Sequence, residues 1–216
     1  MLRYAWVLIM TGMIAMGVQV QADEVKPLEA GAMLPDVRVR TVAGEAFALK
    51  DAVAEKPAVL IFYRGGWCPY CTKHLMAMQE IEEKILAQGY QIFAISPDRP
   101  EKLAETLEAQ ELGYTLLSDA DMVAAKAFGL AFEVDEKTRE TYKGYGIDLV
   151  EASGREHYLL PVPAVYVVNQ AGKITYAFAE EDYKVRLEPE ALLKVLAGSE
   201  KDKAPKAAAC CAACGG

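Results

Sequence analysis

The most constraining feature of this sequence is an uncharged apolar run that leads directly into a pair of cysteines. Residues 58–63 read Ala-Val-Leu-Ile-Phe-Tyr, and a continuous run of this kind is typical of a strand that is covered on both faces. A helix is predicted from Pro69 to about Gln88, closed by Gly89, because apolar residues then recur every three or four positions. The segment that joins the strand to the first turn of the helix reads Arg64-Gly65-Gly66-Trp67-Cys68-Pro69-Tyr70-Cys71.

Strands and helices alternate along the rest of the chain. The alternation predicts an α/β protein, with a central mixed sheet flanked by helices on both faces. Asp98 and Glu101 indicate a capping box at a helix start, and the polar stretch 131–160 is predicted to be a helical or looped insertion. The other predicted strands lie near 37–42, 90–96, 114–117, 164–168 and 174–178, and the other helices near 98–113, 119–129 and 188–196.

The two ends of the chain differ in composition from the middle. Residues 1–22 combine a basic start at Arg3, an apolar run and a small-residue site ending at Ala22, which is the layout of a secretory signal peptide. Export to the periplasm, with no stable membrane insertion after removal of the signal, is therefore expected, and an uncleaved membrane anchor is the alternative. Residues 23–197 are predicted to form one domain, and residues 198–216 a mobile tail that carries Cys210, Cys211 and Cys214.

Charge excludes one large class of function. The chain has 23 Lys and Arg against 31 Asp and Glu, for a formal net charge of −8 at pH 7. A nucleic-acid-binding protein needs a basic surface to meet phosphates, so no nucleic-acid partner is expected.

Two thiols at a helix start indicate redox chemistry. Unpaired N–H groups and the helix dipole favour the thiolate there, so Cys68 is the predicted nucleophile. Cys71, one turn deeper, can close a disulfide on Cys68. Pro69 suits the first helical turn, and Trp67 and Tyr70 would shape the surface of the site. A Cys-X-X-Cys pair can also form half of a zinc site, which would need tail cysteines for the other half.

The turn resembles the active-site turn of the thioredoxin superfamily. Pro163, before a buried strand, resembles that superfamily's cis-proline, and an ordinary trans proline is the alternative. From about Leu28 to Leu196 the chain is similar to the peroxiredoxin-like AhpC/TSA family. The similarity rests on Ile95-Ser96-Pro97-Asp98, Leu117-Ser118-Asp119 and the stretch 162–168.

The sequence departs from both templates. Typical peroxiredoxins carry proline and threonine or serine where this chain has Ile61 and Gly65, and an arginine where it has Pro163. Those groups position and polarise the peroxide, and Arg64 is the candidate substitute for the missing charge. Thioredoxins carry a buried acid where this chain has Phe62.

Three further sets of residues invite a role. His74 lies on the cysteine stripe of the helix and could relay a proton, although simple packing is the commoner role. His157 with Cys68 and Cys71 suggests a copper carrier of the same fold, but the cysteine spacing in that family is different. The tail cysteines could bind Cu(I) or zinc, act as a resolving arm, or have no fixed role.

These observations favour one function over two alternatives. The resemblance implies a thiol peroxidase that reduces hydrogen peroxide or organic hydroperoxides, without a cofactor, and is itself reduced by a thioredoxin-like dithiol protein. The adjacent cysteines also fit a thiol–disulfide oxidoreductase acting on protein disulfides. A copper or zinc carrier is the third hypothesis.

Overall fold

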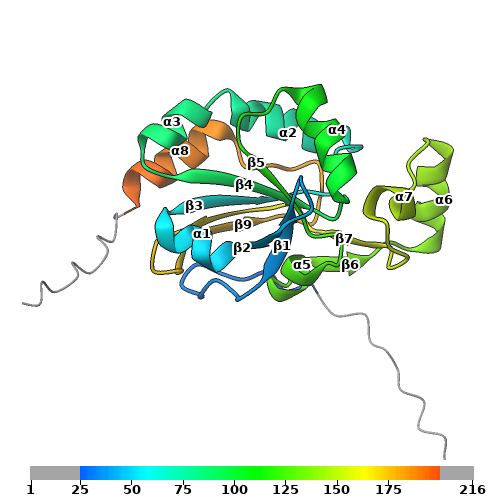
Figure 1. Cartoon of the computed structure of the whole chain (residues 1–216), viewed down its shortest axis with the longest axis horizontal. Helices are drawn as coiled ribbons and strands as arrows, with labels where there is room; N and C mark the ends of the chain where they lie inside the picture. The colour runs from blue at the N-terminus through cyan, green and yellow to red at the C-terminus, as the bar shows by residue number, and fades with distance from the viewer. Residues whose placement is uncertain (1–24, 200–216) are drawn as a thin grey trace, which may run out of the picture.

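A computed structural model describes residues 25–199, which form a mixed sheet between two layers of helices (Figure 1). The seven strands lie in the order β2-β1-β5-β4-β3-β8-β9. β3, β4 and β5 are parallel, and the remaining neighbours are antiparallel. The strands are β1 Arg38–Thr41, β2 Ala46–Ala48, β3 Ala58–Phe62, β4 Gln91–Ser96, β5 Thr115–Ser118, β8 Ala164–Val168 and β9 Ile174–Ala179. The predicted fold class, a thioredoxin-like α/β fold, is confirmed.

The central strand β3 is buried along its whole length, as its apolar run predicts. Its side chains alternate between the two faces of the sheet, because successive residues of a strand point in opposite directions. Leu60 and Phe62 join one apolar cluster, while Val59 and Ile61 join the other. The chain therefore has a core on each side of the sheet.

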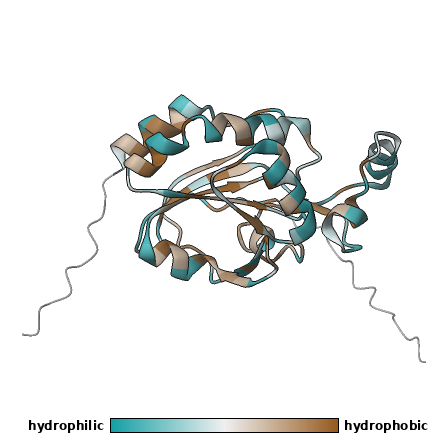
Figure 2. Cartoon of the chain, turned by 45° about the horizontal axis from the view of Figure 1, so that its top comes forward, coloured by the Kyte–Doolittle hydropathy of each residue, from teal (hydrophilic) through white to brown (hydrophobic). Residues whose placement is uncertain are grey.

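The helices divide between these two cores, and their apolar sides turn toward the sheet (Figure 2). On one face, α1 buries Leu49 and Val53, and α5 buries Ala124 and Ala125. On the other, α2, α3, α4 and α8 cover the cluster that also contains Cys68 and Cys71. The helices are α1 Leu49–Glu55, α2 Pro69–Gln79, α3 Glu82–Ala87, α4 Pro100–Gln110, α5 Val123–Ala127 and α8 Pro189–Gly198.

The predicted insertion is a small structured unit beside the sheet. Strands β6 Ala131–Glu133 and β7 Leu159–Pro161 pair antiparallel and carry α6 Glu136–Gly144 and α7 Leu149–Ser153 between them. In Figure 1 these two helices project from one end of the sheet. Asp135 starts α6 by accepting a hydrogen bond from the Thr138 N–H, so this helix is locally encoded.

Several boundaries differ from the sequence prediction. The helix expected over 69–88 is interrupted, because the Ile81 N–H bonds to Met78 three residues back and tightens the last turn of α2. Gln79 bridges the break by donating to Glu82 over 2.6 Å. The sequence analysis did not predict β2 or α1.

The capping-box interpretation of Asp98 is wrong. α4 begins one residue later, with Arg99 as its N-cap and Pro100 as its first residue. Asp98 is instead buried, at 1% exposure, and accepts hydrogen bonds from elsewhere in the fold. Buried carboxylates need such partners, and here the partner is the turn that carries the cysteines.

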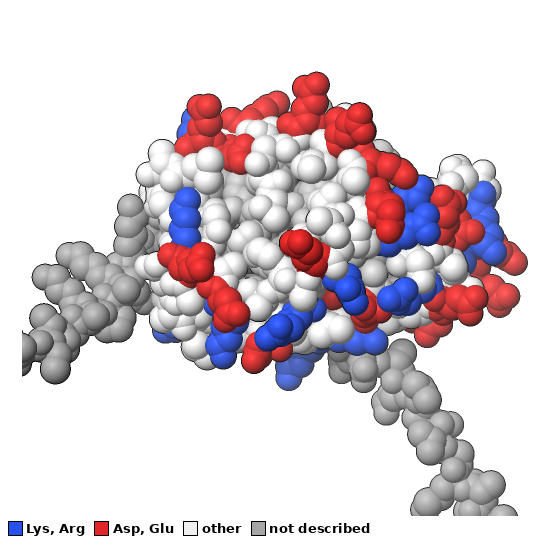
Figure 3. All heavy atoms as spheres, in the orientation of Figure 1, with Lys and Arg blue, Asp and Glu red and all other residues white. Residues whose placement is uncertain are grey.

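The surface is mainly acidic over one helical layer. In Figure 3 acidic side chains gather along the upper edge, where α3 and α4 lie, while basic side chains elsewhere on this face stand among acidic ones. Between residues 25 and 199, no helix has the length and apolar character needed to span a bilayer. The predicted signal peptide, residues 1–22, and the tail cysteines lie outside the described residues, and the predicted domain limits remain predictions.

Candidate redox site

The turn after β3 is shaped by two glycines. Gly65 has a φ of +148°, a conformation that favours glycine. A Cβ there would collide with the Trp67 indole and lie 2.9 Å from an Asp98 carboxylate oxygen, and a Cβ on Gly66 would collide with Thr106. The turn therefore excludes the threonine or serine that typical peroxiredoxins carry at the position of Gly65.

Cys68 stands at the N-terminus of α2, where the sequence predicts it. Its backbone N–H bonds to the Gly65 carbonyl over 3.1 Å, and its carbonyl accepts from the N–H groups of Cys71 and Thr72 over 3.0 Å each. Pro69 is the first helical residue. Both cysteines are free thiols, with Cys68 2% exposed and Cys71 fully buried.

The two sulfurs differ in acidity. Hydrogen bonding from the Cys71 thiol is the main cause that lowers the pKa of Cys68 to about 6, and the Cys71 backbone and the charges of Arg64 and Arg186 act in the same direction against burial. The same hydrogen bond, followed by burial, raises the pKa of Cys71 well above its usual value. Cys68 is thus set up as the thiolate, and Cys71 as the proton-bearing partner.

Arg64 lies almost completely buried within three aromatic rings. Its guanidinium carbon is 4.3 Å from the centroid of Tyr183, 5.4 Å from Trp67 and 5.5 Å from Tyr142. It also donates a hydrogen bond to the Tyr142 hydroxyl. Tyr70, 42% exposed, packs edge-on against Tyr183 at 5.5 Å. The three rings around Arg64 come from the turn, from α6 and from the segment between β9 and α8, and Tyr70 belongs to α2.

Arg186 is a second cation at the dithiol, and the sequence analysis missed it. Its Nη2 lies 3.5 Å from the Cys71 Sγ and donates to it. The residue sits in the segment between β9 and α8, more than a hundred positions from the cysteines. No motif in the sequence marks this position.

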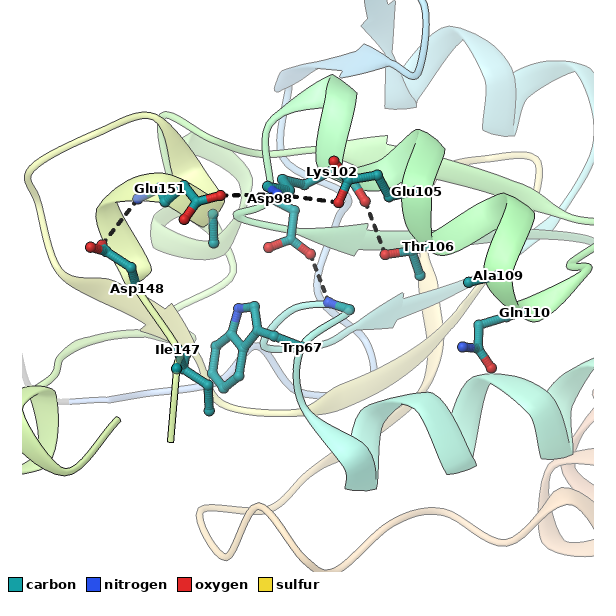
Figure 4. Close-up of a pocket in the computed structure, with 13 residues that line it drawn as sticks. Trp67, Asp98, Lys102, Glu105, Thr106, Ala109, Gln110, Ile147, Asp148 and Glu151 are labelled. Carbon is teal, nitrogen blue, oxygen red and sulfur yellow. Dashed lines mark hydrogen bonds and ion pairs between the residues drawn. The ribbon is translucent and has the colours of Figure 1, made fainter. Parts of the chain in front are cut away.

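Asp98 anchors the turn and faces a cavity of about 300 Å³. Its Oδ2 accepts from the Gly66 N–H over 2.8 Å and from the Ser96 hydroxyl over 3.2 Å, while Oδ1 has no hydrogen-bond partner. Burial raises the pKa of this carboxyl to about 6. Figure 4 shows the Asp98 side chain between Trp67 and Lys102, next to the turn. One sequence signal could have placed Asp98 at this site. It directly follows β4, and β4 runs parallel to β3, the strand that leads into the cysteines.

The cis-proline prediction is wrong. No peptide bond between residues 25 and 199 is cis, so Pro163 is trans. Only two residues separate β7 from β8, which leaves no room for the tight turn in which a cis-proline typically sits. Pro163 still borders the site, because it lines a cavity of about 270 Å³ together with Arg64 and Tyr142.

The two histidines do not join the cysteines as ligands. His74 is buried on α2, and burial lowers its pKa to about 4, so it is neutral at pH 7. His157 uses both ring nitrogens on backbone, with Nε2 2.9 Å from the Ala120 carbonyl and Nδ1 accepting from the Leu159 N–H over 2.9 Å. Among residues 25–199 no group of three possible metal ligands occurs, so this part of the chain offers no support for the carrier hypothesis.

Comparisons with known proteins agree with the fold. Residues 30–177 match the model of the AhpC/TSA family. Peroxiredoxin Bcp from Escherichia coli is 31% identical over 104 residues, which are 48% of this chain and 66% of that protein, just under two thirds of its length.

Solved structures extend the likeness to most of the domain. Peroxidoxin BcpB from Mycobacterium tuberculosis has a TM-score of 0.61 at 21% identity, over 79% of this chain and 95% of that one. Reduced Prx3 from Vibrio vulnificus, in complex with hydrogen peroxide, has a TM-score of 0.65 at 20% identity, over 78% and 99%. On the match over 30–177, the chain belongs to the AhpC/TSA family, peroxiredoxin-like proteins of the thioredoxin superfamily.

Proposed function

We propose that this protein is a thiol peroxidase that reduces hydrogen peroxide or organic hydroperoxides, with Cys68 as the attacking residue and Cys71 as the resolving one. The observation that carries the proposal is the state of Cys68. It is a buried thiol at a helix start, it accepts a hydrogen bond from Cys71, and its pKa is about 6. A thiolate that persists at neutral pH is what attack on a peroxide oxygen needs.

The proposed cycle has two chemical steps before reduction. The Cys68 thiolate attacks one peroxide oxygen, an S–O bond forms, the O–O bond breaks, and the departing alkoxide or hydroxide takes a proton from solvent. The Cys71 thiolate then attacks the Cys68 sulfur of the sulfenic acid. An S–S bond forms, hydroxide leaves, and with the proton released by Cys71 it becomes water. A thioredoxin-like dithiol protein would reduce the disulfide.

Arg64 supports the first step in place of the usual arginine. Its charge is close enough to lower the pKa of Cys68, and the aromatic rings around it hold the guanidinium beside the turn. We assign it the role of stabilising negative charge on the sulfur and on the departing oxygen. Prx3 from Vibrio vulnificus, whose fold is similar, was solved with hydrogen peroxide bound, which supports the choice of substrate.

The deciding experiment offers the reduced protein a peroxide and, separately, a small disulfide. Peroxide should convert Cys68 and Cys71 to a mapped disulfide at least about tenfold faster than it oxidises free cysteine. Cys68→Ser should abolish this conversion, and Cys71→Ser should stop at the sulfenic acid. Inertness toward peroxide with rapid exchange on the disulfide would reject the peroxidase and establish the thiol–disulfide oxidoreductase.

For the tail and the N-terminal segment, the proposal rests on the sequence alone. Changing Cys210, Cys211 and Cys214 together to Ser in the full-length protein should leave disulfide formation between Cys68 and Cys71 unchanged. Export to the periplasm predicts that the secreted protein begins at Asp23. Recovery of the protein from the cytoplasm with Met1 or Leu2 at its N-terminus would reject this location.

A further inference from the structure

The second step of any reaction at this dithiol requires Cys71 to become a thiolate, although its pKa is the higher of the two. Cys71 is fully buried, and its thiol donates a hydrogen bond to Cys68 in the reduced protein. Once Cys68 is oxidised, that hydrogen bond no longer has a thiolate to accept it. Cys71 must then lose its proton and attack, and a nearby positive charge would favour this ionisation.

Arg186 is the side chain whose geometry meets that requirement. Its Nη2 donates to the Cys71 Sγ at 3.5 Å, and its Nη1 is fixed by a 2.9 Å hydrogen bond to the Val185 carbonyl. None of the ion pairs within residues 25–199 involves Arg186, so no carboxylate in that range competes for its charge through an ion pair.

The other groups around Cys71 leave this role to Arg186. The backbone N–H of Arg64 also favours the Cys71 thiolate, but its guanidinium lies within the aromatic rings and acts mainly on Cys68. His74 on α2 is neutral at pH 7. Tyr63, at the end of β3, is buried and has a raised pKa, so it adds no charge.

We propose that Arg186 is a catalytic residue of the resolving step, stabilising the Cys71 thiolate as it attacks the sulfur of Cys68. Arg64 then acts mainly in the first attack, while Arg186, whose charge also favours the Cys68 thiolate, acts mainly in the second. This inference deepens the proposed function, and it depends only on the dithiol, because Cys71 would resolve a peroxide-derived sulfenic acid and a mixed disulfide by the same attack.

An aromatic disulfide separates the two steps without peroxide. The probe is 5,5′-dithiobis(2-nitrobenzoate), used on full-length protein in which the three tail cysteines are Ser. Cys68 attacks the probe, forms a mixed disulfide and releases one coloured thiolate. Cys71 then attacks the Cys68 sulfur, an S–S bond forms, the mixed S–S bond breaks, and a second coloured thiolate leaves. The first and second releases report the two steps.

Arg186→Gln should slow the second release about tenfold and the first by no more than about threefold, because the lost interaction is a charge-assisted hydrogen bond to Cys71. Arg186→Lys should restore most of the second rate. Arg64→Gln should show the opposite pattern, with the larger loss in the first release. The pH midpoint of the second step should rise in Arg186→Gln, which a purely structural role would not cause.

Arg155→Gln is the matched control. Arg155 is also a partly exposed arginine that bonds to the carbonyl of its preceding residue, over 3.1 Å, but it pairs with Asp121 and not with a sulfur. Both of its rates should match the parent protein. The proposal is overturned if Arg186→Gln leaves the second rate within twofold of the parent, or if Arg186→Lys is as slow as Arg186→Gln.

Failure of the peroxidase proposal can be distinguished from failure of the Arg186 proposal. If the parent protein releases both coloured thiolates but does not react with peroxide, the proposed function falls while the role of Arg186 is still tested. If the parent reacts with peroxide but the variant resolves normally, only the role of Arg186 is rejected.

Discussion

The short turn between β3 and α2 and the two distant segments that cover it contribute different things to the site. The turn, residues 63–68, brings the nucleophile to a helix start through local backbone bonds such as that from Cys68 to Gly65, and Asp98 anchors the turn from beyond β4. The insertion and the segment between β9 and α8 bring Tyr142, Tyr183 and Arg186 from far along the chain. The comparison teaches that the sulfur chemistry is encoded locally, while its electrostatic setting is assembled by the tertiary fold.

Restoring the hydroxyl that typical peroxiredoxins have should break the turn. Gly65→Thr is expected to lower the free energy of unfolding by about 3 kcal/mol, since it combines an unfavourable φ with collisions against Trp67 and Asp98. Gly44→Thr is the control, because Gly44 has a φ of +81° but open space around it, and it should cost about 1 kcal/mol. Urea unfolding measures both, and equal losses would mean that the collisions do not matter.

The anchor of the turn should make stability depend on pH. The pKa of Asp98 is raised from 3.8 to about 6 in the folded protein, so its stabilising contribution is complete below pH 3.8 and is lost as pH rises to about 6. Asp98→Asn keeps an acceptor for the Gly66 N–H and removes the titration. Relative to this variant, the parent should lose about 2 kcal/mol between pH 4 and pH 7.

Denaturant unfolding at the two pH values would measure this difference. Asp36→Asn serves as the control, because Asp36 is exposed, and it should follow the parent. A parent and an Asp98→Asn variant with parallel pH profiles would show that Asp98 titrates normally.

The acidity of Cys68 should appear in its rate of alkylation. With a pKa of about 6, the thiolate is the major form at pH 7, and the rate should fall about tenfold between pH 7 and pH 5. Cys71→Ala should move the midpoint upward, because the main cause of the lowered pKa is the hydrogen bond from Cys71. Cys71→Ser keeps a donor and should move it less. Mass mapping of iodoacetamide adducts on Cys68 gives the midpoints, and identical ones in all three proteins would assign the acidity to the turn alone.

The insertion should make the smallest contribution to the reactivity of Cys68. Tyr142→Phe removes the hydroxyl that accepts a hydrogen bond from Arg64 but keeps the ring, so the Cys68 alkylation rate at pH 6 should fall about twofold. Tyr145→Phe, one turn along and 77% exposed, is the matched control and should have no effect. A larger loss in Tyr145→Phe than in Tyr142→Phe would contradict the assignment.

Sequence patterns predicted the elements that depend on local signals. The run at 58–63 predicted a doubly covered strand, and β3 is buried on both faces. Cys68 and Pro69 predicted a helix start, and α2 begins there. The interruption after Gln79 escaped prediction because it depends on a single tightened hydrogen bond within an otherwise regular apolar stripe.

The parts that escaped prediction depend on contacts across the fold. Asp98 has the sequence context of a cap, and only the packing of β4 beside β3 directs it to Gly66. Pro163 has the context of a cis-proline, but only two residues separate β7 from β8, and its peptide bond is trans. Arg186 has no pattern of its own, because its partner Cys71 is distant in sequence.

The packing of Trp67 against Arg64 and Tyr142 gives the protein an optical reporter. The chain contains two tryptophans, and Trp6 falls within the predicted signal peptide, so the processed protein would carry Trp67 alone. Its indole lies next to Cys68 in sequence, 5.7 Å from the Tyr142 ring and 5.4 Å from the Arg64 guanidinium. Oxidation that moves the neighbouring sulfur would alter the emission of this indole, so each turnover could be followed by intrinsic fluorescence, without an added label.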